Sequence, residues 1–325
     1  MTATTELSTA TEIRTLLEGI ALEVEQRFVF PERAPELAAR IRQIEADAYA
    51  GLVPRELSVR LSEELYRLSG DRHLYLRFDP DPPVNGSGDP AWAEARSAWN
   101  NHGVARAERL PGNVGLIELT EFSPLQLAAP VISAAFNLLA RSRALIIDLR
   151  RNGGGHGDTV AFACGYLLRE ATHLITFEER GQKPQMSYSA AWVPGQRFLD
   201  RPVYVLTANR TGSAAEEFAY DLQGAGRATL VGERTSGAGH MCDFRHLPPH
   251  WALIVPTVRP VGAFTGDSWE AVGVQPDREV PAEQALEVAH CAALEGILAD
   301  SGLSSRQREE VERALQGLGS PRSVE

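Results

Sequence analysis

The chain has 325 residues, enough for one large domain with an accessory one, and its 43% hydrophobic and 23% charged residues are ordinary for a globular protein. A net charge of -11 disfavours a phosphate-binding surface and therefore a nucleic-acid partner. No apolar run is long enough to span a membrane, the first eight residues lack the pattern of a signal peptide, and the three scattered cysteines indicate reduced thiols, so we expect a cytoplasmic protein with no membrane partner.

The first seventy residues predict amphipathic helices. Apolar side chains recur at helical spacing from Ile13 to Phe28, from Leu37 to Ala48 and from Leu57 to Leu68. We expect the third helix to end near Gly70, because glycine readily adopts the left-handed conformation that ends helices. Residues 1–72 are therefore expected to form an N-terminal helical domain.

The period of the apolar residues changes directly after these helices. Between His73 and Phe78, apolar and polar side chains alternate, which predicts a half-buried strand with His73 on the face opposite the buried leucines. The stretch from Asp79 to Pro90 is rich in proline, aspartate and glycine, and it predicts a loop or linker. We therefore expect residues 73–112 to form a strand and a linker.

The pattern then alternates between short strands and helices. Continuous apolar strands are predicted at Ala144–Leu149 and Val203–Thr207, and a helix at Pro130–Arg141 with the proline in its first turn. Such alternation is typical of an α/β core with much parallel pairing. Residues 113–300 are expected to form this core, and residues 301–325 a polar C-terminal tail.

Ser213 follows a buried strand through the tight turn that begins at Arg210, and it is expected to open a helix. At this position its hydroxyl points outward, and the amide of Ala214 is left free at a helix N-terminus, where negative charge is favoured. A serine nucleophile needs such donors for the oxyanion that it creates. The alternative is that Ser213 only caps the helix, with Glu216 three residues on as in a capping box.

Three consecutive glycines, Gly153 to Gly155, follow Asn152 after another buried strand. Glycines let the backbone adopt positive φ and approach a ligand closely, so amides of this segment could complete an oxyanion hole. The alternative is a flexible turn between a strand and a helix. A phosphate-binding loop is disfavoured, because no Gly-Lys-Ser/Thr follows.

Two histidines are candidate general bases. His73 begins the predicted strand after the helices, and His240 lies on a glycine-rich loop. A lone histidine is also commonly a structural hydrogen-bonding residue. His246 and His250 are spaced by four, but the prolines between them exclude the helix that a metal-binding pair would need. We therefore expect no metal and no other cofactor.

Seven short motifs occur along the chain. They are Phe28–Pro31, Gly70–Leu74, Asn113–Ile117, Ile147–Gly154, Thr211–Phe218, Val231–Thr235 and Trp269–Asp277. In this order they resemble the S41 serine peptidases, the tail-specific protease superfamily, and in particular the branch similar to interphotoreceptor retinoid-binding protein and the tricorn core protease. The resemblance implies a crotonase-like (ClpP-like) α/β core with a mixed, largely parallel sheet behind an N-terminal helical domain.

The resemblance also assigns catalytic roles. Ser213 would be the nucleophile, with the oxyanion held by the amide of Ala214 and one from Gly153 or Gly154. Many members pair the serine with a lysine, but Ala238 stands at that position here, and the one lysine of the chain matches no motif. The resemblance therefore implies Ser–His rather than Ser–Lys chemistry.

In the tricorn-like and retinoid-binding-like branch, the base comes from the N-terminal segment and an acid from near the closing motif. This implies His73 as the base and Glu270 as the acid that orients it. Arg72 replaces the small residue usual before the histidine, and it could bind a substrate carboxylate or mark a repurposed site. His240 is a second candidate, as a base or as a substrate contact. The sequence contains no PDZ-like insertion between the helical domain and the core.

We therefore predict a serine hydrolase of the S41 type that cleaves a peptide or small amide through an acyl-enzyme on Ser213. One alternative is a binding protein for an apolar small molecule that keeps the fold without turnover. Another is a biosynthetic enzyme that uses the oxyanion hole for acyl transfer or cyclisation. The expected partner is a peptide or small-molecule substrate, and the sequence leaves the oligomeric state open.

Overall fold

The computed structural model describes residues 8–79 and 90–318, and the chain forms two compact units. Unit 1 contains Met1–Pro90, Thr176–Gln185 and His240–Val261, and unit 2 contains the rest. Unit 1 is therefore assembled from three separate stretches of sequence. The N-terminal residues 1–7 and nearly all of the linker predicted at Asp79–Pro90 lie outside the described residues.

Helices form the larger part of unit 1, as the spacing of apolar residues predicted. The first begins at a capping box, in which the side chains of Thr9 and Glu12 accept each other's backbone N–H groups. The last ends at Gly70, which has a φ of 74°. The helices are α1 (Ala10–Arg27), α2 (Ala34–Arg42), the 3-10 helix η1 (Ala46–Tyr49) and α3 (Pro54–Ser69).

Strands of a five-stranded sheet complete the core of unit 1. Its strands are β1 (Tyr75–Phe78), β5 (His173–Glu179), β6 (Gln185–Tyr188), β9 (Met241–Leu247) and β10 (Trp251–Gly262), in the order β1-β10-β5-β6 with β9 also paired to β10. β10 pairs antiparallel with both β1 and β9. Apolar side chains of α1, α2 and α3 pack with those of β9 and β10 in one buried cluster.

The strand predicted from His73 begins two residues later, at Tyr75. A turn precedes it, because Asp71 Oδ1 accepts the backbone N–H of His73 at 2.8 Å, a local bond that bends the chain. Leu74 and Leu76 are buried while Tyr75 is exposed, so the predicted alternation is confirmed. His73 therefore lies in a turn that leads into the sheet.

Unit 2 contains a six-stranded sheet that is mostly parallel, as predicted. Its strands are β2 (Val104–Leu110), β3 (Val114–Leu119), β4 (Ala144–Asp148), β7 (Val203–Thr207), β8 (Thr229–Gly232) and β11 (Arg278–Glu279), in the order β11-β8-β7-β4-β3-β2. β2 pairs antiparallel with β3, and the other pairs in this order are parallel. β4 and β7 are continuous apolar runs because both of their faces are buried.

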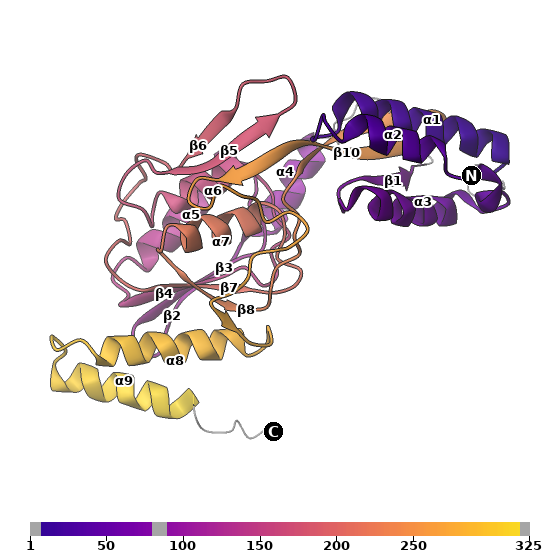
Figure 1. The fold of residues 1–325 in the computed structure, drawn as a ribbon. Coiled ribbons are helices and arrows are strands. Elements are labelled where there is room, and N and C mark those ends of the chain that lie inside the picture. The colour runs from indigo at the N-terminus through magenta and orange to yellow at the C-terminus, as the bar shows by residue number, and fades with distance from the viewer. Residues whose placement is uncertain (1–7, 80–89, 319–325) are drawn as a thin grey trace. The chain divides into compact units, whose positions relative to one another are not determined.

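Helices cover both faces of this sheet. The helices between residues 90 and 318 are α4 (Pro90–Trp99), the 3-10 helix η2 (Asn101–Gly103), α5 (Leu125–Leu138), α6 (Gly157–Cys164), α7 (Ala214–Gly224), α8 (Ala285–Leu298) and α9 (Ser305–Leu318). α8 lies against one face, and α5, α6 and α7 lie on the other (Figure 1). Within the described ranges, no helix combines the length and the apolar character needed to cross a bilayer.

One helix begins earlier than predicted. α5 starts at Leu125, so that Pro130 lies inside the helix rather than in its first turn. The carbonyl of Pro124 opens the helix by accepting the N–H groups of Leu127 and Ala128 at 2.9 and 3.0 Å. The helix tolerates Pro130 at the cost of one missing backbone donor.

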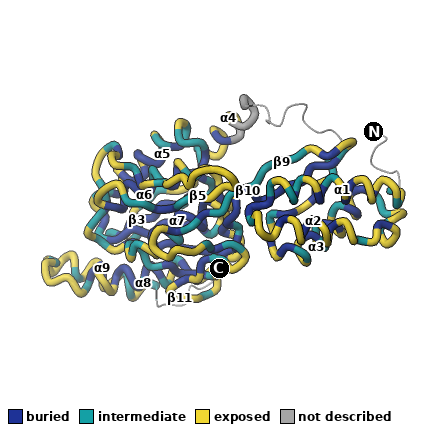
Figure 2. The backbone as a smooth tube through the Cα atoms, turned by 45° about the horizontal axis from the view of Figure 1, so that its top comes forward, coloured by how far each residue is buried: buried dark blue, intermediate teal, exposed yellow. Residues whose placement is uncertain are grey.

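The segment predicted as a polar tail contains a helix. Residues 305–318 form α9, which packs against α8 through the buried side chain of Val311. Figure 2 shows that the remainder of α9 is mostly exposed. A single apolar stripe is therefore sufficient to place this otherwise polar helix.

The sheet of unit 2 positions the two motifs that the sequence singled out. β4 and β7 are adjacent and parallel, with Asp148 opposite Leu206. The segments that follow parallel strands emerge at the same edge of a sheet. The glycine segment after β4 and Ser213 after β7 therefore come together.

Candidate active site

Ser213 has a backbone conformation that is unusual for a residue with a side chain. Its φ of 55° and ψ of -125° match the first central position of a type II′ turn, which glycine dominates. An ordinary helix N-cap has extended backbone angles instead. Residues held in strained conformations cost about 1–3 kcal/mol and are concentrated at functional sites. The turn presents the exposed Ser213 at the N-terminus of α7, where the Glu216 side chain accepts its backbone N–H as in the predicted capping box.

The carboxylate of Glu216 holds this turn in place. Its side chain is fully buried, and Oε2 accepts the backbone N–H of Ser213 at 2.9 Å. Further donors come from the loop after β8. They are the hydroxyls of Thr235 and Ser236, at 2.5 and 3.2 Å, and the amides of Gly237 and Ala238, at 2.7 and 2.8 Å. One buried carboxylate therefore joins the Ser213 turn to residues 235–238.

The glycine segment after β4 packs directly against Ser213. Gly154 has a φ of 117°, and a Cβ atom at this position would lie 2.7 Å from Ser213 Cβ and 3.2 Å from the amide nitrogen of Ala214. Only glycine combines this φ with so close an approach. The two motifs are therefore in contact, and glycine at position 154 is what permits the contact.

Two backbone amides at this contact have no acceptor among the described residues. They belong to Gly153 and Ala214, whereas the amide of Gly154 donates to Asn152 Oδ1 at 2.8 Å. Asn152 is fully buried, and its carbonyl also accepts the N–H of Gly212 at 3.2 Å. Free amides beside a serine are the donors that an oxyanion requires.

The closing motif packs on the loop after β8. Ala271 donates its N–H to the carbonyl of Gly237 at 2.9 Å. The carboxylate of Glu270 accepts the N–H of Gly239 at 2.7 Å. Glu270 therefore anchors the end of this loop within unit 2.

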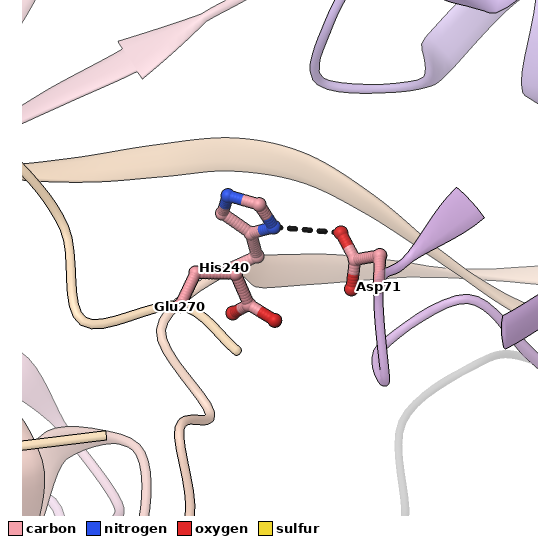
Figure 3. Close-up of side chains that lie close together, drawn as sticks. All are labelled: Asp71, His240 and Glu270. Atoms are coloured by element: carbon pink, nitrogen blue, oxygen red, sulfur yellow. Dashed lines mark hydrogen bonds and ion pairs between the residues drawn. The ribbon is translucent and has the colours of Figure 1, made fainter. Parts of the chain in front are cut away.

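A carboxylate and two histidines lie together in unit 1. Asp71 Oδ2 lies 2.7 Å from Nδ1 of His240, and both side chains are buried (Figure 3). Asp71 Oδ1 lies 3.7 Å from Nδ1 of His73, whose side chain is more exposed. Burial acts to raise the pKa of Asp71, but the hydrogen bonds from the two histidines outweigh it and hold this pKa well below its usual value. Asp71 is therefore a buried anion between two imidazoles.

Arg72 lies in the same turn and is exposed. Its guanidinium carbon stands 5.6 Å from the ring centroid of Tyr66 on α3. The aromatic ring supports the side chain while its charged end remains in solvent.

Two more acids of α7 are buried one turn apart. Oε1 of Glu217 and both carboxylate oxygens of Asp221 have no hydrogen-bond partner among the described residues. Burial raises the pKa of Glu217 to about 8, and burial together with the charge of Glu217 raises the pKa of Asp221. Burial and the same two acids raise the pKa of the Cys164 thiol on α6. Both acids therefore favour the protonated form in the folded protein.

The predicted site residues fall in both units, and each unit is described by itself. Unit 2 holds Ser213, Ala214, Gly153, Gly154 and Glu270, and unit 1 holds His73, His240 and Arg72. Sequence reasoning missed Asp71 and Asn152, and it considered Glu216 only as a cap. A signal for Asp71 was its place two residues before His73, since aspartate commonly bonds the backbone at that spacing.

Replacing Ser213 by glycine should relieve backbone strain that replacement by alanine keeps, while both changes remove the hydroxyl. We expect the free energy of unfolding of Ser213→Gly to exceed that of Ser213→Ala by about 1 kcal/mol, because glycine adopts positive φ without a clash. Urea unfolding of the two variants measures this difference. A glycine variant no more stable than the alanine variant would show that the turn stores no strain.

The raised pKa values of the buried acids Glu217 and Asp221 predict that the free energy of unfolding falls as the pH rises. The folded protein keeps a proton on Glu217 up to about pH 8, whereas the ordinary pKa of this group is 4.5, so the folded state binds more protons in between. As the pH rises from 4.5 to about 8, the free energy of unfolding should therefore decrease, by at most about 1.4 kcal/mol per pH unit for this group.

Glu217→Gln does not titrate and should flatten this slope in urea unfolding measured at several pH values. The exposed Glu283→Gln is the matched control. Equal slopes in the two variants would contradict the assignment.

Comparison with known proteins identifies the family. The model of peptidase family S41 matches residues 113–280. A carboxyl-terminal-processing protease from Picosynechococcus sp. is 34% identical over 172 residues, which cover 52% of this chain and 40% of that protein. The chain thus spans less than half the length of this curated relative.

Two solved structures have the same fold at low sequence identity. The photosystem II D1 C-terminal processing protease aligns with a TM-score of 0.54 and 16% identity over 83% of this chain and 94% of that one. The tricorn protease aligns with a TM-score of 0.56 and 13% identity over 95% of this chain and 37% of that one. The predicted α/β architecture is confirmed. Because the family model covers more than half of the 325 residues, the chain belongs to peptidase family S41.

Proposed function

We propose that this chain is a serine peptidase that cleaves a peptide bond through an acyl-enzyme on Ser213. The observation that carries the proposal is the strained turn at Ser213 with the free amides of Gly153 and Ala214 beside it. In the reaction, Ser213 Oγ bonds to the substrate carbonyl carbon, the C–N bond breaks, and the amine leaves with the proton taken from the hydroxyl. Water then attacks the acyl-enzyme and releases the acid.

We assign the oxyanion hole to the amides of Ala214 and Gly153. The N–H of Gly154 is already donated to Asn152, so Gly154 contributes its conformation rather than a donor. The N-terminus of α7 adds partial positive charge at the same place. Donors of this kind are each worth about a hundred-fold or more in rate, because they act where charge develops.

The base in this proposal is a histidine of unit 1. His73 is the first candidate, because it occupies the histidine position of the family motif and its side chain is more exposed than that of His240. His240 is the second candidate. Ala238 lacks the amine that a Ser–Lys dyad needs, which favours Ser–His chemistry. Glu270 keeps its predicted role as an orienting acid, in addition to its bond to Gly239.

The proposed substrate is a peptide with a free carboxylate near the scissile bond. The Picosynechococcus relative is named a carboxyl-terminal-processing protease, and the exposed guanidinium of Arg72 has the geometry to bind a carboxylate through two parallel hydrogen bonds. We further assign the chain to the tricorn-like and retinoid-binding-like branch, because Ala238 replaces the lysine. We place it in the cytoplasm, because its three cysteines are unpaired.

Labelling of the purified chain by a fluorophosphonate tests the proposed nucleophile and base. We expect wild type to be labelled, Ser213→Ala not to be labelled, and His73→Ala to be labelled on the order of a hundred-fold more slowly, because the hydroxyl then lacks its proton acceptor. Mass spectrometry of the labelled peptide locates the modified residue. His246→Ala, on β9 and outside the cluster with Asp71, is the matched control.

The outcomes separate the candidate functions. Labelling that survives Ser213→Ala would refute the nucleophile, and loss in His240→Ala rather than His73→Ala would reassign the base. A folded wild type that takes no label would favour the binding protein. A labelled enzyme that releases a transferred or cyclised product, instead of the acid, would favour the biosynthetic alternative.

A further inference from the structure

Both carboxylate oxygens of Asp71 are engaged by histidines. Oδ2 accepts from Nδ1 of His240 at 2.7 Å, and Oδ1 accepts the backbone N–H of His73 at 2.8 Å while lying 3.7 Å from its Nδ1. Because an ionised carboxylate only accepts, Nδ1 of His240 carries a proton. The side chains of Asp71 and His240 are 4% and 2% exposed, so their hydrogen bond is shielded from solvent.

Contacts other than those with His73 also hold the carboxylate and the His240 ring. The N–H of Asp71 donates to Ser69 Oγ at 3.0 Å, directly after the end of α3. Phe30 packs edge to face on the imidazole of His240, with ring centroids 5.6 Å apart. The position of Asp71 Oδ1 is therefore set by Ser69 and His240 as well as by its bond to the backbone N–H of His73.

Cys242 and Arg33 are titratable or charged groups of unit 1 that lie near this cluster. Cys242 Sγ lies 4.0 Å from the carbonyl oxygen of His73, and Arg33 donates to the carbonyl of Ser69 at 2.7 Å. Arg72 stacks on Tyr66. Within unit 1, Asp71 Oδ1 lies 3.7 Å from His73 Nδ1.

We infer that Asp71 is a positioning residue for His73 and that His240 holds Asp71 in place. The inference rests on the proposed function, in which His73 accepts the proton of Ser213. His240 binds one oxygen of the carboxylate and thereby directs the other toward His73. The fixed negative charge stabilises the imidazolium that forms on His73, and the backbone bond fixes the turn that carries its ring. Asp71 thus holds the turn of His73 from within unit 1, in addition to the orienting role proposed for Glu270.

The test follows the rate of fluorophosphonate labelling of the full chain between about pH 5 and 9. Asp71→Asn should lower the rate on the order of a hundred-fold and shift the pH of half-maximal labelling down by about one unit, because the imidazolium loses its counter-charge. A purely structural role would leave this midpoint unchanged. Asp243→Asn, a partly exposed acid of β9, is the matched control and should keep both values.

Two substitutions of His240 separate positioning from catalysis. Asparagine places an amide donor near the position of the imidazole Nδ1, so His240→Asn should recover at least about ten-fold of the rate that His240→Ala loses. If Asp71→Asn does not fold, this pair decides the question, because both variants keep Asp71.

Each outcome bears on a different claim. An unshifted midpoint in a folded Asp71→Asn, or a His240→Asn variant as slow as His240→Ala, would overturn the inference while Ser213-dependent labelling of wild type upholds the proposed function. Wild type without Ser213-dependent labelling would overturn both.

Discussion

The geometry of the candidate site depends on one buried carboxylate, that of Glu216. It accepts one hydrogen bond from Ser213 and four from residues 235–238. A buried acid without such donors would be strongly destabilising, so the loops and the carboxylate require each other. Because the donors follow two adjacent strands, β7 and β8, neither loop can move without leaving buried polar groups unsatisfied.

This constraint explains how a serine persists in a conformation that suits glycine. Positive φ at Ser213 is unfavourable, but Glu216 binds its amide and Gly154 packs against its Cβ, so the chain has no room to relax. The unpartnered acids Glu217 and Asp221 on the same helix add a second destabilising contribution. α7 is therefore destabilised at its N-terminus and along its buried face. The large apolar core of unit 2 compensates for this loss of stability.

Local sequence predicted most of the fold. For each contact in the candidate site it singled out one partner and missed the other. The apolar runs of β4 and β7, the end of α3 at Gly70 and the turn before Ser213 depend on neighbouring residues, and these were predicted. Hydrogen bonds between residues that are far apart in the sequence were not predictable. Glu216 could be seen as a cap of Ser213, but its partners in the loop after β8 are not local. Asp71 and His240, which share a hydrogen bond, are 169 positions apart, and no periodicity carries that information.

The composition of unit 1 also dictates the order in which the chain can fold during synthesis. The helices α1–α3 leave the ribosome before the strands that cover their apolar faces, because β9 and β10 are encoded after residue 240. At about 5–20 residues per second this delay is on the order of ten seconds or more. Every strand from β2 to β8 is made in that interval. The nascent chain must therefore keep three amphipathic helices from aggregating until their partners arrive.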